Sequence, residues 1–158
     1  MAAAAASMGA KVRLQDIPGY WPRKHPDCVV PVVREAMMQV LGEFKRGTNW
    51  PTGCSDMGDV GAVMPAIHPH IAGCTGNAHS NSYRIADPET ACVKSAEVQF
   101  VMLQILLKNG GEEVQKIVRE YEPEFKSMEE YFAYVDKLAL DKEAVTYEDG
   151  RIILDYEN

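Results

Sequence analysis

A segment in the middle of the chain gathers side chains that hold metals and transfer protons. It runs TGCSDMGDVGAVMPAIHPHIAG and continues shortly afterwards as GNAHSNSYRIADPETA. Aspartate and histidine bind divalent metals or exchange protons near neutral pH, and glycines allow a backbone to approach a ligand closely. We therefore interpret the segment as one wall of an active site. Its candidate site residues are Asp56, Asp59, His68 and His79.

Each candidate also has a purely structural interpretation. His79 projects from a predicted loop, where a histidine is usually a surface residue or a local hydrogen-bond partner. Asp56 and Asp59 lie three residues apart. They either share a helix face and bind a cation, or cap a short helix and close a turn. His68 and His70 alternate along a predicted strand, so they point to one face, for metal binding or for packing.

The composition indicates a globular chain of one domain's size. It has 158 residues, of which 46% are hydrophobic. A net charge of -7 and dispersed basic residues argue against a nucleic-acid partner. We find no apolar run near the roughly 20 residues that span a bilayer, and the alanine-rich start lacks the basic region of a signal peptide. We therefore expect no membrane partner and a cytoplasmic location.

The four cysteines stand without Cys-x-x-Cys spacing, and no nucleophile signature flanks any of them. A chain without an export signal favours reduced thiols over disulfides. We therefore expect small buried apolar side chains rather than a structural zinc-cysteine site or a cysteine nucleophile.

The beginning of the chain predicts a border between two domains. Residues 1–8 are typical of the end of a helix that Gly9 stops, and alternating polarity predicts a strand over Lys11–Asp16. The proline-rich linker IPGYWPRKHPD follows. We place the border after residue 22, which gives segments 1–22 and 23–158.

Helical spacing of apolar residues predicts a helix over 29–41, with Asp27 as its cap and Gly42 as its stop. Residues 53–61 are rich in glycine, which predicts a loop leading into a turn of helix. Residues 63–71 predict a short buried strand, placed at a sheet edge because two prolines interrupt it.

The second half of the chain is predicted to be mostly helical. A helix capped by Asp87 runs to Asn109, apolar nearly all round, and we expect it to be the buried spine. Two amphipathic helices follow, near 112–121 and 127–138, and should cover the outside of the fold. Finally, Asp149 and Gly150 between two β-type runs predict a hairpin.

Three segments, in this order, resemble peptidase family M-twenty, the metal-dependent aminoacylases, carboxypeptidases and amidohydrolases. They are CSDMGDVG at Cys54–Gly61, VMPAIHPHI at Val63–Ile71 and AHSNSYRIAD at Ala78–Asp87. The branch with aminobenzoyl-glutamate hydrolases typically carries segments like STDMGDVS and VMPTIHPY, then a loop histidine before the last long helix. The resemblance covers about residues 1–137 and concerns the C-terminal part of the family.

The resemblance implies an α/β fold, specifically the helix-rich C-terminal portion of a zinc-exopeptidase-like catalytic domain. In the family, a smaller lid domain interrupts this domain and often mediates dimerisation. Residues 1–22 would be the end of the lid, and residues 23–158 would belong to the catalytic domain with a helical and hairpin tail.

The resemblance also assigns roles to the candidate site residues. His79 would be a ligand of one of two adjacent divalent metals, expected to be zinc, which activate water for amide hydrolysis. Asp56 and Asp59 would support the pocket or contact substrate, and His68 is a further pocket residue. None is assigned as a catalytic general base. Expected substrates are small N-acyl or N-aroyl amino acids or peptides.

The remaining metal ligands and the catalytic glutamate of the family lie in its N-terminal half, whose motifs are absent from this sequence. A catalytic zinc normally has three protein ligands, so one histidine does not complete a site. We therefore expect no hydrolase activity unless another chain supplies the missing half. The alternatives are a subunit of a split enzyme, a non-catalytic binding or interaction module that forms a homodimer or heteromer, and a decayed fragment.

Overall fold

The chain folds into a mixture of helices and small antiparallel sheets. A computed structural model describes residues 1–47 and 53–155. It divides into two compact units. One unit joins Met1–Gly19 to the chain from Phe125 onward, and the other is Tyr20–Glu124. The coarse expectation of a mixed helix and sheet fold is confirmed.

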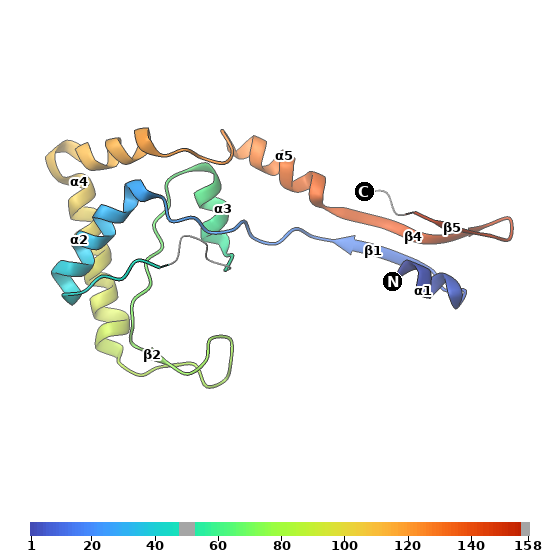
Figure 1. Ribbon diagram of the computed structural model, residues 1–158, viewed down its shortest axis with the longest axis horizontal. Helices are drawn as coiled ribbons and strands as arrows, with labels where there is room; N and C mark the ends of the chain where they lie inside the picture. Colours follow the sequence, from blue (N-terminus) through green and yellow to red (C-terminus); the bar gives the residue numbers. More distant parts are fainter. Residues whose placement is uncertain (48–52, 156–158) are drawn as a thin grey trace. The chain divides into compact units, whose positions relative to one another are not determined.

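The first unit is built on a three-stranded antiparallel sheet (Figure 1). Its strands are β1 (Val12–Asp16), β4 (Leu140–Glu148) and β5 (Arg151–Leu154), in the order β1-β4-β5. Asp149 and Gly150 join β4 to β5 with φ of 47° and 75°. Positive φ at both positions defines the tight turn whose twist matches paired strands. The predicted first strand and the predicted hairpin are both confirmed.

A small core lies between this sheet and helix α1 (Ala2–Ser7). Ala2, Ala144 and Val145 are buried there. Ala144 and Val145 are neighbours in sequence, and strict alternation would place them on opposite faces. The ladder shifts register here, because Val12 pairs with Val145 while Arg13 pairs with Glu143. This bulge leaves Ala144 as the extra residue and allows both side chains to be buried.

Helix α5 (Met128–Leu138) begins as its sequence predicts. The Ser127 hydroxyl accepts a hydrogen bond from the Glu130 backbone N–H at 3.2 Å. The Glu130 carboxylate in turn accepts one from the Lys126 backbone N–H at 2.8 Å. These two bonds satisfy N–H groups that have no partner within the helix. The expected helix and its cap are therefore confirmed.

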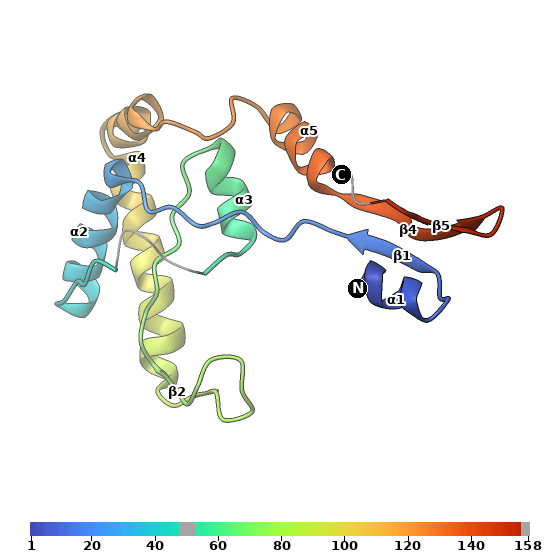
Figure 2. The same ribbon diagram turned by 45° about the vertical axis from the view of Figure 1, so that its right-hand side comes forward.

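The core of the second unit forms where helix α2 (Val30–Leu41) packs along helix α4 (Ser95–Glu120), as Figures 1 and 2 show. Val32 and Ala36 on α2 meet Val98 and Met102 on α4, and all four are buried. Gly42 ends α2 with φ of 73°, as predicted.

The predicted cap of α2 is wrong. A 3-10 turn, Asp27–Val29, precedes the helix. The Asp27 side chain makes no capping hydrogen bond and forms an ion pair with Arg46 instead. A long cation nearby competes with the backbone N–H groups for the carboxylate, and local sequence does not reveal such a partner.

Helix α4 follows a π-helical segment, Glu89–Lys94, whose start is capped as predicted. The Asp87 carboxylate accepts hydrogen bonds from the Thr90 N–H at 3.1 Å and the Thr90 hydroxyl at 2.6 Å. The backbone leaves helical geometry from Lys108 to Gly111. This break separates the two helices that the sequence predicts on either side of Asn109.

The expectation that α4 is a buried spine is wrong for half of its circumference. Val98 and Met102 are buried, whereas the opposite face is exposed, with Phe100, Leu103 and Leu107 at 61%, 51% and 61%. We call these three residues, together with exposed Val93 on the preceding π-helical segment, the exposed α4 stripe. By length and composition, Glu89–Glu120 is also a candidate membrane span, because one window of 18 residues in it has a mean hydropathy of 1.3, and 11% of that window is buried.

The predicted strand over 63–71 is also wrong. Helix α3 (Asp56–Val63) is longer than the expected turn and includes Val63, and the chain from Met64 to Ile71 has no strand pairing. Pro65 and Pro69 lack N–H groups, so this segment is a poor partner for a ladder. The strands nearby are the two-residue pair β2 (Cys74–Thr75) and β3 (Arg84–Ile85).

Gly58 allows the linker to lie against α3. A Cβ atom on Gly58 would stand 1.9 Å from the Trp21 carbonyl oxygen, whereas one on Gly61 would meet only the Ala66 methyl at 3.8 Å. Pro22 and Cys54 also form a β-bridge beside this contact. The linker and α3 are therefore in direct backbone contact.

We expect G58A to destabilise the Tyr20–Glu124 unit by about 1–3 kcal/mol, because the added methyl group overlaps backbone. The matched control G61A should be neutral or stabilise by up to about 1 kcal/mol, since alanine favours a helix over glycine. Urea unfolding followed by tryptophan fluorescence measures both. Equal effects of the two variants would contradict the close contact.

Candidate functional site

His79 lies on an exposed loop with an uncommon backbone conformation. The loop joins β2 to β3, and His79 has φ of 61°. The left-handed region costs a residue with a side chain roughly 1–2 kcal/mol, although histidine is found there more often than most. Such an outlier persists only where its surroundings fix it, and it is a reason to consider a functional role.

Hydrogen bonds within the loop fix this conformation. The Ser80 hydroxyl donates to the Asn77 carbonyl at 2.9 Å, and the Tyr83 N–H donates to the Ser80 carbonyl at 3.2 Å. The Ser80 and Ser82 hydroxyls lie 2.6 Å apart. These bonds hold the backbone on both sides of His79.

The base of the loop is tied to the helix that follows it. The Gly73 carbonyl accepts hydrogen bonds from the N–H groups of Ala86 and Asp87 at 2.8 and 2.9 Å. A Cβ atom on Gly73 would stand 2.6 Å from the Ala91 nitrogen. Because Asp87 also caps the helical segment, the His79 loop is anchored directly on the start of the long helix.

Asp56 and Asp59 both lie in the first turn of α3, and both carboxylates accept hydrogen bonds from backbone N–H groups. Asp56 accepts from the adjacent Met57 N–H at 2.9 Å. Asp59 accepts from the Trp21 N–H at 2.6 Å. The Asp59 bond crosses from the linker to α3 and has a clear structural use, because it satisfies a backbone donor of the linker.

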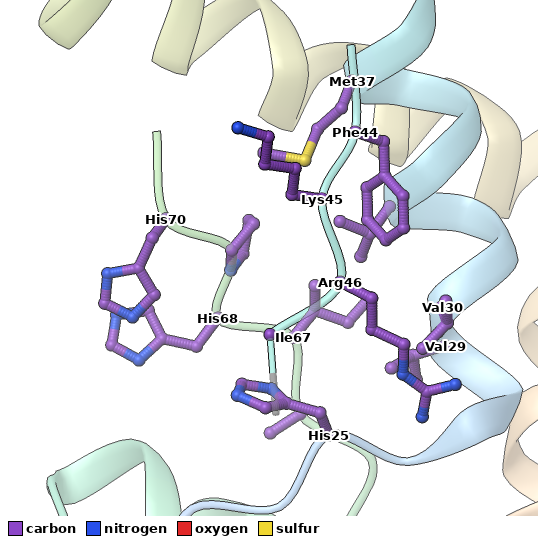
Figure 3. Close-up of a pocket in the computed structure, with 14 residues that line it drawn as sticks. His25, Val29, Val30, Met37, Phe44, Lys45, Arg46, Ile67, His68 and His70 are labelled. Carbon is purple, nitrogen blue, oxygen red and sulfur yellow. The ribbon is translucent and has the colours of Figure 1, made fainter. Parts of the chain in front are cut away.

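His68 lines a pocket of about 240 Å³ in the Tyr20–Glu124 unit, together with His25 and His70 (Figure 3). The His68 and His70 rings stack, with centroids 5.1 Å apart and planes at 29°. Both therefore lie on the same side of their segment, as expected from alternation, although no strand is formed. The pocket lining does not include Asp56, Asp59 or His79.

An arginine beside His70 assigns the tautomer of its neutral ring. Arg23 Nη1 lies 2.9 Å from His70 Nε2. A guanidinium group only donates, so Nε2 is the acceptor and neutral His70 carries its proton on Nδ1. Burial, followed by the charges of His68 and Arg23, lowers the pKa of His70. Burial, followed by the charge of Arg23, also lowers the pKa of His25.

The structure thus keeps Asp56 and Asp59 together on α3, places neither of them nor His79 in the pocket that His68 lines, and adds two residues to that pocket. His68 joins His70 and His25, whereas His79 stands on its own loop. Sequence reasoning missed His25 because it lies more than forty residues before His68 and was assigned to a linker. The available signal was the repeated His-Pro pair at 25–26 and 68–69, because proline favours an extended conformation in the residue before it.

The described residues do not by themselves fit a zinc ion. Across residues 1–47 and 53–155, no group of three histidine, cysteine, aspartate or glutamate side chains is placed to hold a metal. All four cysteines are free thiols. A tetrahedral zinc site takes three or four protein ligands, so a zinc ion bound at His79 would need ligands from outside the described residues.

Comparison of the chain with protein-family models, with curated proteins and with solved structures found no match. The assignment of a function therefore depends on the sequence motifs and on the geometry above.

We expect the Tyr20–Glu124 unit to lose stability as the pH falls. The pKa values of His25 and His70 are lowered in the folded chain, so the unfolded chain binds more protons below the ordinary histidine range. The two neutral imidazoles therefore contribute to the free energy of unfolding above about pH 6.5. This contribution is lost as the pH falls through their pKa values in the folded chain.

Urea unfolding at about pH 7.5 and about pH 5.5 measures this dependence, which should be smaller in the H25Q/H70Q variant because glutamine does not titrate. The control H79Q should keep the full dependence. If H25Q/H70Q and the original chain respond equally to pH, the imidazoles of the pocket are not the cause.

Proposed function

We propose that this chain is the C-terminal part of a metal-dependent amidohydrolase, in which His79 is one ligand of a divalent metal, zinc. The observation that carries the proposal is the His79 loop. Its imidazole is exposed, and hydrogen bonds on both sides hold its backbone in a left-handed conformation. An accessible imidazole on a fixed backbone suits metal binding, because little backbone freedom remains to be lost when the bond forms.

The three motifs that resemble peptidase family M-twenty give the proposed reaction. It is hydrolysis of the amide bond in N-acyl or N-aroyl amino acids or small peptides. Residues 1–22 would be the end of the lid, and residues 23–158 would belong to the zinc-exopeptidase-like catalytic domain. Asp56 and Asp59 would support the pocket, with Asp59 holding the linker through the Trp21 N–H. The location would be cytoplasmic.

The exposed α4 stripe supports the need for a further segment. Phe100, Leu103 and Leu107 recur at spacings of three and four residues, so they share one face of α4, and Val93 precedes them in the π-helical segment. A buried central helix of an α/β domain is apolar on more than one face, because elements pack on several sides of it. We infer that protein rather than lipid covers the stripe, since Lys94 and Glu97 stand at its start and the helix breaks at Lys108.

We expect the chain alone to release no amino acid from N-acyl substrates with zinc present. A polypeptide carrying the missing family ligands, first sought in the coding sequence immediately upstream, should restore zinc-dependent release. In that pair, H79N should reduce turnover by at least about a hundredfold, because a metal ligand is lost. Asparagine tolerates the left-handed conformation, so the variant removes the imidazole and keeps the loop.

The control Q115A changes an exposed side chain elsewhere on α4 and should leave turnover of the pair unchanged. Robust zinc-dependent turnover by the chain alone would overturn the proposal of an incomplete site. Full turnover of the pair with H79N would overturn the role of His79.

A second candidate function is a non-catalytic interaction module, acting as a homodimer or as a subunit of a larger assembly. The exposed α4 stripe favours it, because contiguous apolar surface on a helix marks a protein interface. This function needs the stripe but does not need the His79 imidazole.

We expect F100E to weaken association of the chain with itself or with its partner by at least about tenfold, because a charge placed at the centre of an apolar contact is left unpaired. Sedimentation velocity measures the change. The matched control is V118E, since Val118 is also exposed, at 60%, and lies beyond the helix break. Equal loss with both variants would mean that added charge alone prevents association.

A further inference from the structure

The pocket beside α2 has an apolar wall on one side. Helix α2 contributes Val33 and Met37, and the chain after it contributes the Phe44 ring, which lies beside the helix in Figure 3. Ile67 adds a further apolar side chain from the extended segment. Surfaces of this kind accept the apolar body of a ligand.

The rest of the pocket is lined by polar, basic side chains. Its polar side chains are three imidazoles, His25, His68 and His70, and two cations, Lys45 and Arg46. No carboxylate is among the described residues that line it, although the chain has 23 acidic and 16 basic residues. An acidic chain that leaves one pocket entirely to basic groups favours an anion there.

The cations differ in how far they are already neutralised. Arg46 forms an ion pair with Asp27, which stands outside the pocket lining. Lys45 has no partner among the described residues. The positive charge that is still available to a ligand therefore belongs mainly to Lys45.

One buried atom in the pocket wall lacks a partner. His68 Nδ1 is inaccessible to solvent and has no hydrogen-bond partner among the described residues. A buried polar atom without a partner is destabilising, and such atoms in native structures call for an explanation. A carboxylate oxygen in the pocket would satisfy it once the His68 ring turns to bring Nδ1 to the pocket surface.

We propose that this pocket binds a small organic anion, with one carboxylate facing the imidazoles and Lys45 and an apolar body of about one ring against Phe44 and α2. The volume of about 240 Å³ is below the roughly 300–1,000 Å³ of sites for drug-sized ligands, so the ligand is small. Inorganic phosphate lacks the apolar body that the wall would cover. The site does not depend on amide hydrolysis or on a metal at His79.

The test titrates the intact chain with phenylacetate and follows the imidazole ring protons by NMR. Resonances of His25, His68 and His70 should shift together and saturate, while that of His79 should not move. Phenylacetamide, which lacks the charge, and acetate, which lacks the ring, should each shift them at least about tenfold more weakly. Inorganic phosphate should also bind at least about tenfold more weakly than phenylacetate when the two compete.

A variant separates specific binding from general attraction to positive charge. K45Q should weaken phenylacetate binding at least about fivefold, because it removes the available cation. The matched control K108Q removes the same charge outside the pocket lining and should bind as the original chain does. Four results would each overturn the proposal. Two concern affinity: phenylacetamide binds as tightly as phenylacetate, or K108Q loses as much affinity as K45Q. Two concern the spectra: the His79 resonance shifts with those of the pocket histidines, or no imidazole resonance shifts.

Discussion

The packing of α2 against one face of α4 is the contact on which the larger unit depends. Val32, Ala36 and Val98 are almost completely inaccessible there, at 1%, 0% and 0%. The contact fixes the start of α4, and the His79 loop is tied to that start through Gly73 and Asp87. It also fixes α2, from which Val33 and Met37 form part of the wall of the histidine pocket. One apolar interface thus positions both sites without placing them together.

The same contact explains why α4 needs a further partner in the proposed enzyme. Packing on α2 covers Val98 and Met102 but leaves Phe100, Leu103 and Leu107 in solvent. An apolar helix face of this kind is favourable to cover. In the proposed function, one additional segment would cover this open face and would also supply the metal ligands that His79 alone does not provide. The second candidate function, a non-catalytic interaction module, needs only the exposed apolar face of α4.

Local signals made much of the secondary structure predictable from the sequence. Gly42, Ser127 and the Asp149-Gly150 pair act through their own backbone geometry or their nearest neighbours, so their effects were foreseen correctly. The prediction for Asp27 failed because Arg46, nineteen residues away, binds its carboxylate. The strand over 63–71 failed because prolines remove the donors that a ladder needs. Tertiary contact brings His25 to His68, and the repeated His-Pro pair indicates only a shared backbone preference, so the pocket was not predicted.

Zinc-edge anomalous diffraction from crystals of the chain in complex with the polypeptide that completes it tests the central claim most directly. The account predicts a zinc peak at bonding distance from the His79 imidazole, about 2.0–2.1 Å, with the other ligands from the partner and the α4 stripe covered. A zinc ion held in that complex without His79, or a stripe still facing solvent, would contradict it.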